Sequence, residues 1–147
     1  MTNVRGNASG FLKATTTDPE LQNFDAEEMF YSVVGGRSLQ GWASLSAWPN
    51  ERRNIAFNFV DGGDIPNQTF DFATSPEVSA TWWKSTSGSS ESPYYANSGT
   101  VTVSVNAATD TATAKFHFTA VAPNGKDQVT VAGELDLAPN DQGSVNL

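Results

Sequence analysis

The sequence predicts an all-β protein, either an antiparallel β-sandwich or a flattened β-barrel of about eight or nine strands. Apolar and polar residues alternate with a period of two along most of the chain, as they do in strands with one buried face. Clusters of glycine, proline and asparagine separate these segments, and no long segment has the period of an amphipathic helix. Only 16% of the residues are charged, which is typical of antiparallel sheets with serine- and threonine-rich outer faces.

The clearest element is a three-stranded meander near the C-terminal end. Apolar side chains alternate through residues 101–105, 112–120 and 129–137, so each strand has one dry face and one wet face. Between the second and third strands, Asn124 and Gly125 form a strong hairpin signal. A dry face cannot be stable in water, so a second sheet or the closure of a barrel must cover it.

The earlier part of the chain supplies this cover. It contains further alternating segments, such as the one that places Ile55, Phe57 and Phe59 on one face. The long segment 85–99 is rich in serine and is expected to be a loop, of a length that often carries function or mobility. The pattern does not separate a sandwich from a barrel. The expected strands are 9–16, 28–34, 38–48, 53–60, 68–72 and 78–84.

Length, charge and cysteine content limit the classes of function. The 147 residues are expected to form a single β domain that needs no disulfide. The formal net charge of −8 opposes nucleic-acid binding, because phosphate contacts require a basic surface. Apolar runs are too short for a membrane span. Thiolate metal sites are excluded because the chain has no cysteine, and we expect no cofactor. The N-terminus lacks a classical secretion signal, so we expect a cytoplasmic location, leaderless export, or a mature form with an added Met.

The sequence offers little for catalysis. A Ser-His-Asp triad would have to use His117, and no serine lies in a nucleophile-elbow pattern. His117 falls on the polar face of its strand, so we expect a solvated or cross-strand-paired histidine. Glycosidases need two carboxylates across a cleft, and 16 acidic residues single out no pair. We therefore expect no enzymatic activity, with a carboxylate-dependent hydrolase as an alternative.

A calcium site is a weak candidate at Asp61 and Asp64. These two acids flank Gly62 and Gly63, and hard oxygen ligands beside glycines suit Ca²⁺. The segment lacks the ligand spacing and the terminal glutamate of an EF-hand loop. An exposed turn without metal is the simpler interpretation.

Aromatic residues are the best candidates for ligand contacts. Trp82 and Trp83 are adjacent, so in a strand one of them must face away from the other. Trp42 is expected opposite the apolar face of its own strand, and Tyr94 and Tyr95 lie in the serine-rich segment. Flat aromatic faces can stack on sugar rings or on side chains of a partner. The alternative is that these residues close the ends of the core.

The order of these signals resembles a group of small bacterial β-domains of unknown function that often occur on lipoproteins. The resemblance rests on an early strand with the sequence FLKATT, a middle strand with NIAFNF, and a final meander with SGTVTVSV, AKFHFTAV and DQVTVAGELDL. It is strongest over residues 99–137. It implies a β-sandwich or β-barrel and a bacterial source, and it supplies no catalytic residues.

These observations predict a non-enzymatic binding module. It would present an aromatic patch or pocket to a carbohydrate or another small ligand. The alternative is a structural or protein-interaction domain that forms oligomers or pairs with another chain through strand edges.

Overall fold

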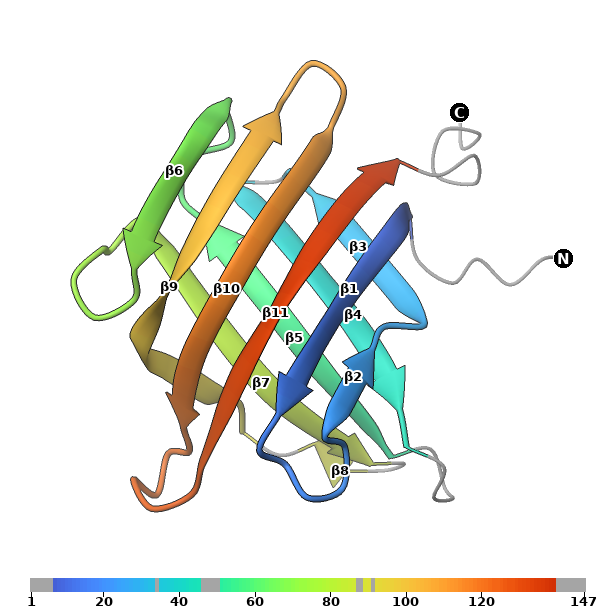
Figure 1. The fold of residues 1–147 in the computed structure, drawn as a ribbon, viewed down its shortest axis with the longest axis vertical. Helices are drawn as coiled ribbons and strands as arrows, with labels where there is room; N and C mark the ends of the chain where they lie inside the picture. Colours follow the sequence, from blue (N-terminus) through green and yellow to red (C-terminus); the bar gives the residue numbers. More distant parts are fainter. Residues whose placement is uncertain (1–6, 34, 46–50, 87–88, 91, 140–147) are drawn as a thin grey trace, which may run out of the picture.

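The structure is a computed structural model that describes residues 7–33, 35–45, 51–86, 89–90 and 92–139. The described residues form eleven strands and no helix, which confirms the all-β prediction (Figure 1). Accordingly, none of them belongs to a helix that could cross a membrane. The strands are β1 (Ala8–Thr16), β2 (Asn23–Asp25), β3 (Glu28–Ser32), β4 (Arg37–Ser44), β5 (Arg52–Phe59), β6 (Ile65–Asp71), β7 (Val78–Thr86), β8 (Ser89–Ser90), β9 (Tyr94–Asn106), β10 (Thr111–Val121) and β11 (Gln128–Pro139).

Eight of these strands form an antiparallel meander. From β3 the order runs through β4, β5, β7, β9 and β10 to β11, and β11 then pairs with β1. The remaining strands are additions: β2 pairs with β1, β6 with β9, and β8 with β7. Short connections favour this arrangement, because sequential antiparallel strands can be joined by hairpins.

The sheet curls so that β1 and β3, at the two ends of this order, come into contact (Figure 1). The side chain of Asn7, directly before β1, imitates a backbone pair with β3: its Nδ2 donates to the Tyr31 carbonyl at 2.9 Å, and its Oδ1 accepts from the Tyr31 N–H at 2.8 Å. In the connection between β2 and β3, the N–H of Ala26 donates to the carbonyl of Leu12 in β1 at 2.9 Å. These contacts bring the two edges of the curled sheet together, and the resulting half-barrel is consistent with a flattened barrel or a sandwich; we refer to it below as the barrel.

The barrel is filled by the apolar rows that the alternation predicts. Phe57 lies at the centre of an aromatic cluster, with its ring centroid 4.8 Å from that of Phe116 and 5.9 Å from that of Phe118. Ring pairs at such distances add about 0.5–1.5 kcal/mol each to the burial of their area. The residues of this core with no exposed surface include Leu12, Leu39, Ile55, Val101, Val103, Val131 and Leu137.

The segment predicted as a loop over 85–99 is shorter than expected, because β9 already begins at Tyr94. A register shift in the pairing of β9 with β10, opposite Thr119 and Ala120, interrupts the alternation of apolar and polar residues in β9. The sequence pattern therefore does not identify the start of this strand. Gly99 belongs to this strand. It has a φ of +104°, and a Cβ there would lie 2.1 Å from the His117 carbonyl oxygen.

The free edge of β6 carries features that oppose pairing with another chain. Pro66 has no N–H to donate, and Asn67 has a φ of +40° beside a register shift in the pairing with β9. Proline and local irregularity are common protections of edge strands.

Candidate ligand site at one end of the barrel

The structure divides the five predicted aromatic contacts between the interior and the exterior. Trp82 is fully buried and Tyr94 is 8% exposed, and both lie inside one end of the barrel. Trp42 and Trp83 are half-buried on the outer face, and Tyr95 is 58% exposed. This division follows from strand alternation, since Trp82 and Trp83 are neighbours in β7 and Tyr94 and Tyr95 are neighbours in β9.

A cavity of about 270 Å³ opens at the end of the barrel that contains Trp82 and Tyr94. This end lies at the bottom of Figure 1. Four separate segments form its wall: the turn between β1 and β2, the C-terminal half of β7, the start of β9, and the connection from β10 into β11. We refer to this cavity as the mouth. Its lining residues are Thr17, Asp18, Pro19, Trp82, Lys84, Tyr94, Asp127, Gln128 and Val129.

Trp82 is the most unusual residue of the mouth. Its ring packs against Phe24 with 6.1 Å between the centroids, and its backbone pairs with that of Tyr94. Its Nε1–H is buried, and no hydrogen-bond acceptor for it is present among the described residues. A buried donor without an acceptor costs about 1–3 kcal/mol. Such a group in a native fold requires an explanation, and a water molecule or a bound ligand can supply the acceptor.

Lys84 is the second polar group of β7 in the mouth. It lies two residues after Trp82 and therefore on the same inner face of the strand. Its Nζ lies 5.6 Å from the ring centroid of Tyr94, a cation–π distance. The described residues include no ion-pair partner for Lys84.

A buried ion pair fixes the turn that forms one wall of the mouth. The Nε of Arg53 donates to Asp18 Oδ2 at 2.9 Å, and its second terminal nitrogen donates to Glu20 at 2.8 Å. Asp18 is 5% exposed and Arg53 is 2% exposed. The other oxygen of Asp18 accepts from the Glu20 N–H at 2.9 Å. Both oxygens of Asp18 are thus engaged, and the turn is tied to β5.

The ion pair also sets the protonation of Asp18. Burial by itself would raise its pKa. The hydrogen bonds from Arg53 and from the Glu20 N–H, together with the positive charges of Arg53 and Lys84, outweigh this effect and hold the pKa below its usual value of 3.8. Asp18 is therefore a carboxylate at neutral pH.

The outer pair of tryptophans forms a packed cluster with charged neighbours. The centroids of Trp42 and Trp83 are 5.4 Å apart, and the guanidinium of Arg52 lies 4.6 Å from the Trp42 ring centroid. Arg52 also forms an ion pair with Glu28. Beneath the rings, buried Asn54 donates to the Gln40 side chain at 3.1 Å. One face of Trp42 is therefore already occupied by Arg52.

The loop considered for calcium has one oxygen of each carboxylate and two of its carbonyls engaged by the protein. Asp61 accepts from the Gly63 N–H at 2.8 Å, and Asp64 accepts from the Ala107 N–H at 2.7 Å. The carbonyls of Gly62 and Gly63 accept from Arg37 at 2.7 Å each. Within the described ranges, no three acidic or histidine side chains are grouped as a metal site would require.

His117 has the pairing that the sequence suggested. Its Nε2 lies 3.2 Å from the hydroxyl of Thr100, the residue directly opposite on β9, and both belong to an exposed face. The hydrogen bond is an ordinary cross-strand contact.

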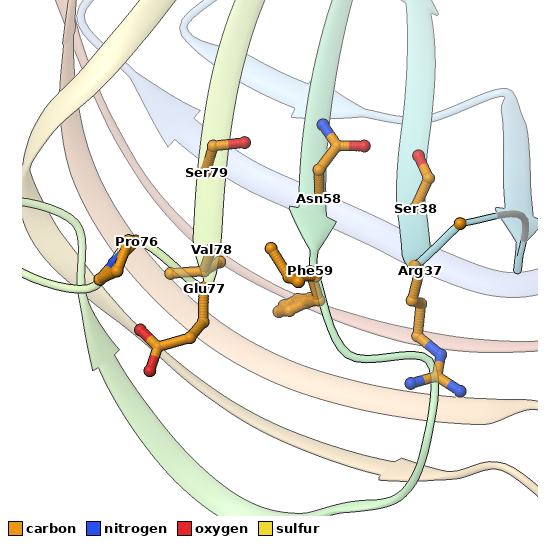
Figure 2. Close-up of a pocket in the computed structure, with 11 residues that line it drawn as sticks. Arg37, Ser38, Asn58, Phe59, Pro76, Glu77, Val78 and Ser79 are labelled. Carbon is orange, nitrogen blue, oxygen red and sulfur yellow. The ribbon is translucent and has the colours of Figure 1, made fainter.

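A second cavity lies at the opposite ends of β4, β5 and β7 (Figure 2). Its volume is about 220 Å³. Figure 2 shows Ser38, Asn58 and Ser79 side by side on three neighbouring strands, with Glu77 at one margin. None of the five predicted aromatic contacts lines it, and Trp82 Nε1, the buried unpaired donor, belongs to the other end. The mouth is therefore the better candidate.

Sequence reasoning missed Lys84, Asp18 and Arg53 as parts of the site. Lys84 could have been found, because it lies two residues after Trp82 in one strand and its side chain therefore points to the same face. The contact between Asp18 and Arg53 joins residues 35 positions apart, and no local pattern signals it.

The chain matches no known protein family, no curated protein and no solved structure. The resemblance to small bacterial β-domains over residues 99–137 therefore stays a prediction. The function of this protein has to be argued from the chemistry of the mouth.

Proposed function

We propose that this protein is a binding module whose mouth holds one small polar ligand, with a carbohydrate as the first class to test. The observation that carries the proposal is the buried Nε1–H of Trp82, which lacks an acceptor although its residue lines a cavity. A ligand oxygen would complete this hydrogen bond once a neighbouring side chain of the mouth moves aside, because the Nε1 atom itself has no exposed surface.

The size of the mouth favours a ligand of about one sugar ring. Ligand pockets commonly measure about 300–1,000 Å³. At about 270 Å³, the mouth lies just below this range and can enclose about one ring.

The chemistry of the wall supports a ligand with several hydroxyl groups. Trp82 and Lys84 can only donate hydrogen bonds, Asp127 can accept them, and Tyr94 and Gln128 can do both. A hydroxyl group also donates and accepts, so a sugar can match each of these partners.

The backbone of the wall is fixed before any ligand arrives. Trp82, Lys84 and Tyr94 belong to strands, and Asp18 is held by Arg53. Groups that are already in place lose little conformational entropy on binding. This supports binding without rearrangement of the barrel.

Isothermal titration calorimetry with a panel of neutral and acidic monosaccharides tests the proposal. We expect at least one of them to bind the wild type. Trp82→Phe removes the indole N–H and should weaken this binding about tenfold, the effect of one lost hydrogen bond to a buried donor. Trp83→Phe is the matched control, since the adjacent ring lies outside the mouth, and it should bind like the wild type.

A second variant separates binding from folding. Tyr94→Phe removes only a hydroxyl group and should also weaken binding, while its melting curve stays close to that of the wild type. Absence of binding by every sugar, or equal binding by the Trp82→Phe and wild-type proteins, would contradict the proposal.

A further inference from the structure

We infer that the ligand of the mouth carries a carboxylate, as acidic sugars do, and that Lys84 and Trp82 bind this group. The inference rests on the proposed function and adds the chemical class of the ligand. It follows from an imbalance between donors and acceptors on the inner wall.

The two polar groups of β7 in the mouth are donors only. Trp82 offers Nε1–H and Lys84 offers a positively charged ammonium group. Their Cα atoms are about 6.5–7 Å apart along the strand, because they are two residues apart on the same face. Two side chains at this spacing can converge on one small group. Neither has an acceptor or ion-pair partner among the residues that the structure describes.

Two acidic groups beside the mouth are already engaged within the protein. Asp18 uses one oxygen for Arg53 and the other for the N–H of Glu20. The Glu20 side chain pairs with Arg53 from an exposed position. The charge of Lys84 acts on Asp18 at long range, but Lys84 forms no ion pair with it among the described residues. A ligand carboxylate would offer two oxygens, one for Trp82 and one for Lys84, together with a compensating charge.

The opposite wall limits the ligand to one acidic group. Asp127 accepts from Asn124 through Oδ2 at 3.1 Å and lines the mouth next to Gln128. Its charge would repel a second carboxylate but would accept a hydrogen bond from a hydroxyl group. A ring with one carboxylate and several hydroxyls fits both walls.

The net charge of −8 does not prevent such binding at physiological salt. Charges are screened over a Debye length of about 8 Å at 0.15 M ionic strength. The local contacts of Lys84 therefore decide the affinity. The distant acidic residues of the chain mainly slow the approach of an anion.

Matched pairs of neutral and acidic sugars provide the test. Glucose is compared with glucuronate, and galactose with galacturonate, by isothermal titration calorimetry at pH 7 and 0.15 M salt. We expect the acid of at least one pair to bind about ten- to a hundredfold more tightly, since hydrogen bonds to charged groups are the stronger ones. Acetate serves as a third probe. If it binds as tightly as the uronates, small organic acids are the source of the carboxylate.

Two lysine variants make the test specific. Lys84→Met keeps the aliphatic stem and should abolish the preference for the acid, because loss of the ammonium group weakens binding of the acid more than binding of the neutral sugar. Lys115→Met is the matched control, because Lys115 is exposed on β10 and lines no part of the mouth, and it should retain the preference.

The outcomes distinguish the inference from the proposed function. Equal or tighter binding of the neutral sugars, or a preference for the acid that survives in Lys84→Met, overturns the inference and leaves a binding site for neutral ligands. Absence of binding by every probe overturns both.

Discussion

The ion pair between Asp18 and Arg53 is expected to be a main support of the mouth. Asp18→Asn keeps the shape and an acceptor for the Glu20 N–H but removes the charge that faces Arg53 at 2.9 Å. A hydrogen bond between charged groups contributes about 1.5–3 kcal/mol, and the remaining partner Glu20 is exposed and compensates in part. We expect the free energy of unfolding to fall by about 2 kcal/mol.

Urea denaturation at pH 7 measures this loss. With a slope of about 2 kcal/mol/M, the midpoint should shift by about 1 M. Asp136→Asn is the control, because Asp136 is exposed on β11, and its midpoint should stay within about 0.25 M of the wild type.

The pH dependence gives a sharper test of the same reasoning. The pKa of Asp18 is lowered in the folded protein, so its contribution is complete above the unfolded pKa and is lost as the pH falls through the folded pKa. The difference between wild type and Asp18→Asn should therefore be largest at neutral pH and should shrink below pH 3.8. A difference that stays constant down to pH 2 would refute the electrostatic explanation.

Three further predictions concern other parts of the barrel. Asn7→Ala removes both side-chain bonds to Tyr31 and should lower the free energy of unfolding by about 1–2 kcal/mol in urea denaturation, whereas an unchanged midpoint would mean that the closure is held by other contacts. Gly99→Ala places a Cβ 2.1 Å from the His117 carbonyl at a φ of +104° and should cost at least about 3 kcal/mol; a thermal midpoint equal to that of the wild type would contradict this. Burial raises the pKa of Tyr31 above 10.0 despite the bond from Arg37, so stability should fall as the pH rises through this folded pKa, and Tyr31→Phe should reduce the loss seen in alkaline denaturation curves.

Much of the fold could be predicted because burial of one face imposes a period of two on the sequence. The rows of β10 and β11 follow this period without interruption. Tyr94 was assigned to a loop because β9 contains a register shift, and a pattern test fails where the pairing slips. The choice between a sandwich and a barrel could not be predicted, since closure depends on the side chain of Asn7 and its contact with a strand 24 residues away.

The site could be predicted only in part, for a similar reason. Adjacent Trp82 and Trp83 had to face opposite sides, and the structure places one in the core and the other outside. Which of the two faces inward depends on the register of β7 against β5 and β9. Arg53 lies two residues before Ile55 in one strand, so the sequence predicts that its side chain points inward as well. Its partner Asp18 comes from a turn that is distant in the sequence and could not be predicted.

The pairing of β1 with β11 has a consequence for how the chain folds during synthesis. Ala8 lies opposite Pro139, so β1 has only the short strand β2 as a neighbour until almost the whole described chain has been synthesised. During that time, the exposed edge and apolar face of β1 are open to chaperones and to other nascent chains. Contacts between residues so far apart also slow folding, because the intervening chain must be ordered first. Because β11 pairs with both β10 and β1, its arrival completes the sheet on two sides at once.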